Sequence, residues 1–177
     1  CMWNIYLFPH TVTRILDYVF DKCTTLQEVT LPDGVTDIGR HVFESCCCIT
    51  EMIPPKELRK IGNGAFQGCR MLEKAVLPNG IDEVVDSLFS GCYTLTEIVI
   101  PKSVTTVSRY SFENCQCMKR YYFLPDSPPE LTTTGTFLGL PKDCKFYVPK
   151  GRLDVYQTAE SWSNYASYMV EMEGDVL

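Results

Sequence analysis

Apolar residues recur along the chain at a fixed interval of 23 residues. Phenylalanine is scarce, at 9 of 177 residues, so five copies in one register do not arise by chance. Two columns define the period best, one of phenylalanine and one of cysteine three residues later: Phe20, Phe43, Phe66, Phe89 and Phe112, and Cys23, Cys46, Cys69, Cys92 and Cys115. Such self-similarity indicates a repeat protein whose units stack on one another.

The clearest copy of the unit reads LTEIVIPKSVTTVSRYSFENC and runs from Leu95 to Cys115. Its first part, L-x-x-I-x-I followed by proline, is typical of a short strand. Its middle part, V-x-x-V, predicts a tight turn or a short 3₁₀ piece, and F-x-x-C then returns the chain to the next strand. A unit this short cannot bury its own apolar face. We therefore expect a mainly β fold with short helical turns, a right-handed solenoid with one parallel sheet along its length.

Local departures from the repeat modify this expectation. Pro54 stands where other copies have leucine or isoleucine, and because proline has no N–H to donate, we expect that strand to fray. Ala75 occupies a column of larger residues, and we expect Met52 one coil earlier to fill the space. Trp3 falls in the column of Leu26, so the chain begins inside a repeat, and we expect an N-terminally truncated array with further repeats before it.

These columns resemble the BspA-type leucine-rich repeat, the 23-residue class in which F-x-x-C replaces F-x-x-L. The resemblance covers about Trp3 to Phe123. It implies a solenoid of about five units over residues 1–124 and a C-terminal capping unit over residues 125–177. The tail has the features of the family's terminal unit, including a closing amphipathic helix: Phe137, Cys144, a strand at Tyr147, Val148 and Pro149, and an apolar stripe at Leu153, Tyr156, Ala159 and Trp162.

The same resemblance carries an expectation about function. Proteins with this repeat resemble bacterial and protist surface adhesins, which implies a non-catalytic protein-interaction module that is extracellular or at the cell surface. The fold class does not name a particular protein partner. Two alternatives stay open: a passive structural spacer array, and a carbohydrate-binding accessory domain that contacts glycans.

Composition narrows the classes of function. The net charge of −6 and the isoelectric point near 4.9 give no electrostatic footprint for nucleic acid or for an anionic membrane. No apolar run is long enough to span a bilayer. The sequence contains no phosphate-binding loop, zinc-protease, nucleophile-elbow or EF-hand motif, so we expect no enzyme activity and no cofactor.

The cysteine triplet Cys46, Cys47 and Cys48 requires a separate interpretation. Cys46 belongs to the repeated column and is expected to be a buried, inert thiol, whereas Cys47 shares a column with polar residues and is expected to be exposed. The column of Cys48 is ambiguous. Cys48 and Cys117 are three coils apart, about 14 Å at one strand spacing per coil, which is too far for a disulfide. A zinc site is also disfavoured, because the two histidines, His10 and His41, lie on different coils.

Residues between the inward positions of each strand are expected to point to the concave side of the sheet. One such row is charged and mixed in sign. The next row is largely apolar and is expected to widen at its C-terminal end to Tyr121, Tyr122 and Phe123. Contiguous exposed apolar area is typical of interfaces, although β-branched residues are also common in strands for their own sake. We predict partner binding by this face, through Glu28, Glu51, Ile53, Lys74, Val76, Glu97, Val99, Arg120 and Tyr122.

Overall fold

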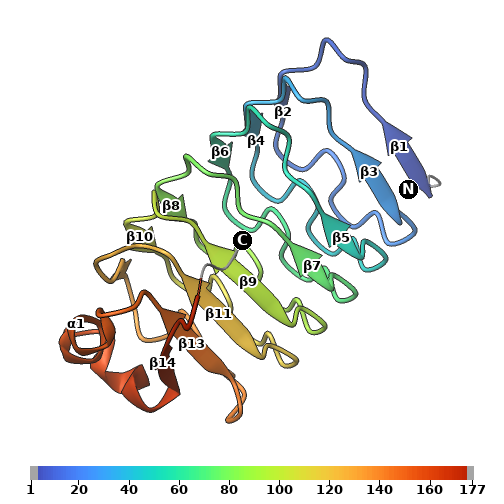
Figure 1. Ribbon diagram of the computed structural model, residues 1–177. Helices are drawn as coiled ribbons and strands as arrows, with labels where there is room; N and C mark the ends of the chain where they lie inside the picture. Colours follow the sequence, from blue (N-terminus) through green and yellow to red (C-terminus); the bar gives the residue numbers. More distant parts are fainter. Residues whose placement is uncertain (1–3, 175–177) are drawn as a thin grey trace.

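The computed structural model describes residues 4–174 and shows a stack of coils that repeat every 23 residues (Figure 1). Each coil contributes one strand to a line of parallel strands, which we call the first ladder. In register, Arg120 pairs with Glu97 and Tyr122 with Val99. The strands are β1 (Ile5–Leu7), β3 (Glu28–Thr30), β5 (Glu51–Met52), β7 (Lys74–Ala75), β9 (Glu97–Ile100), β11 (Arg120–Phe123), β13 (Lys145–Val148) and β14 (Met169–Glu171). The predicted parallel β solenoid is confirmed.

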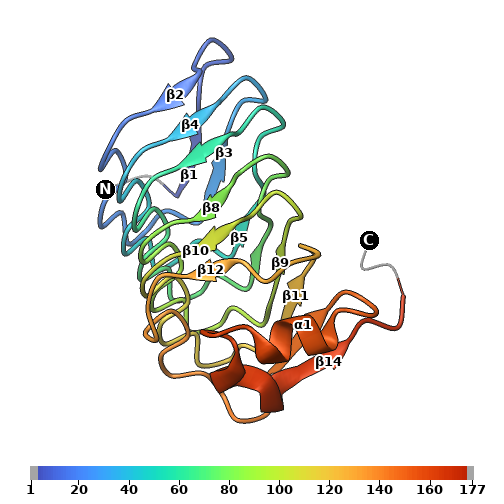
Figure 2. The same ribbon diagram turned by 90° about the vertical axis from the view of Figure 1, so that its left-hand side faces the viewer.

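A second line of short parallel strands runs along another side of the coils (Figure 2). It comprises β2 (Arg14–Ile15), β4 (Asp37–Ile38), β6 (Lys60–Ile61), β8 (Glu83–Val84), β10 (Thr106–Val107) and β12 (Glu130–Leu131). The predicted 3₁₀ piece at V-x-x-V is absent from the clearest copy: a tight turn closes at the first valine, where Val104 N–H donates to the Pro101 carbonyl at 3.1 Å, and the second valine lies in a strand. These strands add a second ladder beside the predicted sheet. The reason is that stacked coils offer main-chain partners that an isolated turn lacks: Gly39 N–H donates to the Ile15 carbonyl of the preceding coil at 2.8 Å.

The third side of each coil is a turn whose phenylalanines stack into a column through the core. The ring centroids of Phe43 and Phe66 lie 5.2 Å apart, and the ring centroid of Phe89 lies 5.8 Å from those of Phe66 and Phe112. The chain returns through a left-handed residue just before each cysteine, with φ of 57° at Ser45. Glycine adopts this conformation at least cost, which explains its choice at Gly68 and Gly91 in the same column.

The C-terminal segment covers the last coil, as the capping prediction requires. Helix α1 (Leu153–Thr158) is followed by a 3₁₀ helix (Ser163–Tyr168) and by β14. Tyr156 and Trp162 are buried, and their polar tips are satisfied: the Tyr156 hydroxyl donates to the Pro125 carbonyl at 2.8 Å and the Trp162 indole to the Pro129 carbonyl at 2.7 Å. The helix is shorter than the predicted stripe, because the backbone turns extended at Ala159.

The first ladder is interrupted at two places within residues 4–174. Strands β3 and β5 are not hydrogen-bonded to each other, and neither are β7 and β9. The strand before Pro54, β5, ends at Met52, as the predicted fraying requires. Ala75 is buried beside Met52, its partner in the register. Trp3, on which the expectation of a truncated repeat depends, lies outside the described residues.

Candidate functional site

Side chains of the first ladder alternate between the core and solvent, which defines its outer face. In β9, Ile98 and Ile100 are buried, whereas Glu97 is exposed and Val99 is half-buried. All nine residues predicted for the binding face lie on this outer face, exposed or half-buried. The expected widening was wrong for Tyr121 and Phe123, which point inward and are 1% and 0% exposed. Alternation along a strand places only Tyr122 of that trio outside.

The charged row of the outer face changes character along the solenoid. At one end, Glu28 and Glu51 occupy equivalent positions in consecutive coils. Further along, Arg120 donates to the Glu97 carboxylate at 2.6 Å and 3.0 Å from two nitrogens, and these hydrogen bonds raise the pKa of Arg120. The pair is half exposed, so its contribution to stability is small. It does fix the orientation of both side chains beside the apolar row.

The apolar row is longer than the sequence indicated. Ile53 and Val76 are 68% and 50% exposed, and Tyr122 stacks on Tyr147 of the next coil, with ring centroids 4.9 Å apart. Val170 of β14 pairs with Tyr147 and extends the row further. Sequence reasoning missed these last two residues because the spacing from Tyr122 to Tyr147 is 25 residues rather than 23. The alternating run Lys145–Val148 was the signal that could have placed Tyr147 outside.

Four of the column cysteines are buried thiols that donate to the carbonyl of a phenylalanine one coil earlier: Cys46, Cys69, Cys92 and Cys115. The distances are 3.1 Å from Cys46 to the Phe20 oxygen, and 3.2 Å from Cys92 to the Phe66 oxygen. Burial raises the pKa of Cys46 to about 12 and that of Cys92 well above its ordinary value. These thiols are therefore inert at neutral pH. A cysteine suits this column because it fills a small apolar site and also supplies a donor.

The other two cysteines of the triplet lie nearer the surface. Cys47 is half-buried rather than exposed, because its thiol turns toward the Ser45 carbonyl at 3.3 Å. Cys48 is also half-buried. The nine cysteines that the structure describes are all free thiols. Within residues 4–174, no group of three or more His, Cys, Asp or Glu side chains is placed to hold a metal ion.

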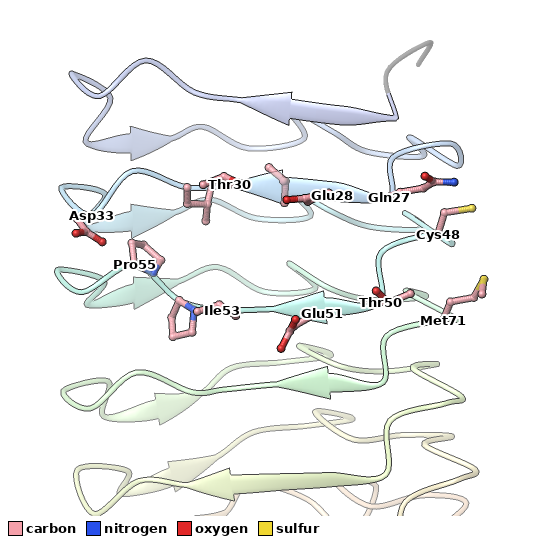
Figure 3. Close-up of a pocket in the computed structure, with 13 residues that line it drawn as sticks. Gln27, Glu28, Thr30, Asp33, Cys48, Thr50, Glu51, Ile53, Pro55 and Met71 are labelled. Atoms are coloured by element: carbon pink, nitrogen blue, oxygen red, sulfur yellow. The ribbon is translucent and has the colours of Figure 1, made fainter.

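A groove of about 710 Å³ opens on the outer face where β3 and β5 are not paired (Figure 3). Thr30 and Ile53 lie along its two walls, with Glu28 and Glu51 at the equivalent positions two residues earlier. Cys48 and Met71 lie at one end, and Asp33 and Pro55 lie at the other. Sequence reasoning placed Glu28, Glu51 and Ile53 on this face but did not predict the groove.

Comparison with known families identifies the repeat. Residues 2–119 match the BspA type leucine rich repeat region, in six copies. The chain belongs to the BspA-type leucine-rich repeat family. The match ends close to the last regular coil, and the expected F-x-x-C columns lie within it. A comparison with curated proteins finds no significant match.

Solved structures share the BspA-type fold at low sequence identity. A leucine-rich repeat protein from Bacteroides ovatus is 24% identical, with a TM-score of 0.61 over 84% of this chain and 46% of that one. The pneumococcal vaccine antigen PcpA is 19% identical, with a TM-score of 0.71 over 98% of this chain and 42% of that one. A leucine-rich cell surface protein from Faecalibacterium prausnitzii is 18% identical, with a TM-score of 0.50 over 89% and 63%.

These likenesses establish the fold, and the BspA-type chain spans less than half the length of the first two proteins. None of the helices described in residues 4–174 is long and apolar enough to cross a membrane. The chain is thus a repeat module that resembles bacterial cell-surface leucine-rich repeat proteins.

Proposed function

We propose that this chain is a non-catalytic protein-interaction module of a cell-surface or secreted protein, and that the outer face of the first ladder binds a protein partner. The observation that carries the proposal is the apolar row, which crosses consecutive coils on a solvent-exposed face: Ile53, Val76, Val99, Tyr122, Tyr147 and Val170. A continuous exposed apolar surface of this kind is typical of interfaces. The vaccine antigen and the cell surface protein among the structural matches support the location.

The chemistry of the row supports a protein ligand. Tyrosine and arginine are the residue types that most often anchor interfaces, and Tyr122 and Arg120 lie side by side on β11. The Glu97–Arg120 pair sets one charged edge beside the apolar centre, an arrangement that favours specificity over raw affinity. A passive spacer would need no such continuous row.

The test compares the double variant Val99→Ser and Tyr122→Ala with the wild-type chain. Both side chains are partly solvent-exposed and lie outside the core, so the melting temperature should change little. Binding to a panel of purified serum and extracellular-matrix proteins, measured by surface plasmon resonance, should weaken at least tenfold, which is about 1.4 kcal/mol. The matched control is Tyr93→Ala, an exposed tyrosine away from the outer face. Equal losses in both variants, or binding that responds to Tyr93 alone, would show that the proposed face is wrong.

A further inference from the structure

The interruption between β3 and β5 leaves main-chain hydrogen-bonding groups facing the groove. Glu28 N–H donates back to the Asn4 carbonyl at 3.1 Å, so the alternate residue, Val29, directs its main-chain groups toward β5. Likewise, Val76 N–H donates to the Met52 carbonyl at 3.2 Å, so Ile53 directs its groups toward β3. In a closed ladder the Ile53 N–H would donate to the Val29 carbonyl, and between these described strands no such ladder bond forms.

Two carboxylates flank the opened strands without a cationic partner in contact. Within residues 4–174, Glu28 and Glu51 take part in none of the ion pairs, and no lysine or arginine lines the groove. The nearby Asp33 is neutralised by Lys56 at 2.8 Å. Lys74 lies in register with Glu51 on β7 without forming an ion pair. The walls of the groove therefore carry a net negative charge.

Two residues after Glu28 and Glu51, along the same two walls of the groove, lie Thr30 and Ile53. Ile53 is 68% exposed, so this level of the groove is the more apolar one. Side chains two residues apart on an extended strand point to the same side. A strand lying between β3 and β5 would place one side chain between the two carboxylates and another beside Ile53.

We propose that the groove between β3 and β5 binds an extended segment of a protein partner by strand addition, with a lysine or arginine between Glu28 and Glu51 and an apolar residue two positions away beside Ile53. This inference rests on the proposed function and names its ligand class. Strand addition supplies affinity through main-chain hydrogen bonds, and side-chain pockets supply the specificity. The free groups of Val29 and Ile53 provide those bonds, and the uncompensated Glu28 and Glu51 provide the charge selection.

The experiment uses a short fluorescent peptide of threonine and alanine that carries one lysine and one valine two positions apart. Anisotropy should show binding, and hydrogen exchange should show slower exchange of the Glu51 and Ile53 amides when the peptide is present. Replacing the peptide lysine with glutamate, or methylating its main-chain nitrogens, should weaken binding at least tenfold. On the protein side, Glu28→Gln with Glu51→Gln should give a similar loss. The matched control, Glu97→Gln, removes a charge from the same row on β9, which is hydrogen-bonded to β11 and does not line the groove, and should change affinity less than twofold.

Several outcomes would overturn the inference. The inference is wrong if the lysine peptide does not bind, or if the methylated or glutamate peptides bind equally well. It is also wrong if Glu97→Gln weakens peptide binding as much as the double variant does. Slow exchange of the Ile53 amide in the free chain, together with dimerisation in solution, would show that a second copy occupies the groove instead. The proposed function fails separately, because it depends on Val99 and Tyr122, which do not line the groove. If the Val99→Ser, Tyr122→Ala variant loses partner binding and the wild-type chain does not bind the peptide, the outer face is supported as the binding face and strand addition in the groove is ruled out.

Discussion

Phe89 offers the most direct test of the stacked core. Its side chain is fully buried, and its ring lies 5.8 Å from those of Phe66 and Phe112. Phe89→Ala should lower the free energy of unfolding by about 3–5 kcal/mol, the range for a buried phenylalanine. Two ring pairs are lost, each contributing about 0.5–1.5 kcal/mol beyond the buried area. Urea denaturation followed by far-ultraviolet circular dichroism measures the change.

Two companion variants separate the ring contacts from the position in the stack. Phe89→Leu keeps most of the apolar volume and removes both ring pairs, so it should cost about 1–2 kcal/mol. Phe20→Ala should cost less than Phe89→Ala, because local opening near the end of a stack does not require the whole array to unfold. Phe20 has edge contacts with Tyr6 and Phe8, so its loss is still measurable. Equal losses at Phe20 and Phe89, or a loss below about 1 kcal/mol at Phe89, would refute this reasoning.

Two further predictions concern the cysteines. Iodoacetamide with mass spectrometry should label exposed Cys117 first and half-buried Cys47 and Cys48 next, while the buried column stays unmodified until denaturant is added; early labelling of Cys92 would contradict the buried column. The raised pKa of the column thiols makes the free energy of unfolding fall at alkaline pH. Above about pH 9 the unfolded chain ionises thiols that the native state keeps neutral. The loss continues up to the pKa of Cys46, about 12. Between about pH 8 and pH 10.5 the urea midpoint of the parent chain should fall, and that of the double variant Cys69→Ala, Cys92→Ala should fall by less. An equal fall in both proteins would show that these thiols are not the cause.

The inward columns could be predicted from the sequence because every coil presents the same position to the same environment. Ile98, Cys92 and Phe89 are buried as their columns require. β5 ends before Pro54, as predicted from the missing N–H, but β7 is equally short with Leu77 at the equivalent position, so the proline alone does not set the strand length. The outward row followed from the same register, and the structure places all of its predicted members on one face.

The second ladder, the line of short strands from β2 to β12, could not be predicted. Its two-residue strands are too short to show an alternating pattern. Their pairing depends on the neighbouring coils, as the Gly39 bond to Ile15 illustrates, rather than on local propensity. The end of α1 at Thr158 has a similar origin: Trp162 reaches its buried site through an extended residue and a turn rather than along a continuous helix. The two extra residues between Tyr122 and Tyr147 hid the continuation of the apolar row.

The groove lies where the repeat places like charges at equivalent positions of consecutive coils. In the closed part of the ladder, the charged column sets Glu97 against Arg120, and the two strands are hydrogen-bonded. Three coil pairs earlier in the stack, the same row sets Glu28 beside Glu51, and these strands are not paired. Like charges directly opposite each other destabilise a strand pair, so a closed pair here would set two carboxylates against each other. Charge is not the general cause of an interruption, because β7 and β9 are also unpaired although this row places Lys74 and Glu97 there. A cation placed between the two carboxylates would reverse that repulsion. The two carboxylates on the walls of the groove are therefore the feature that selects a basic ligand.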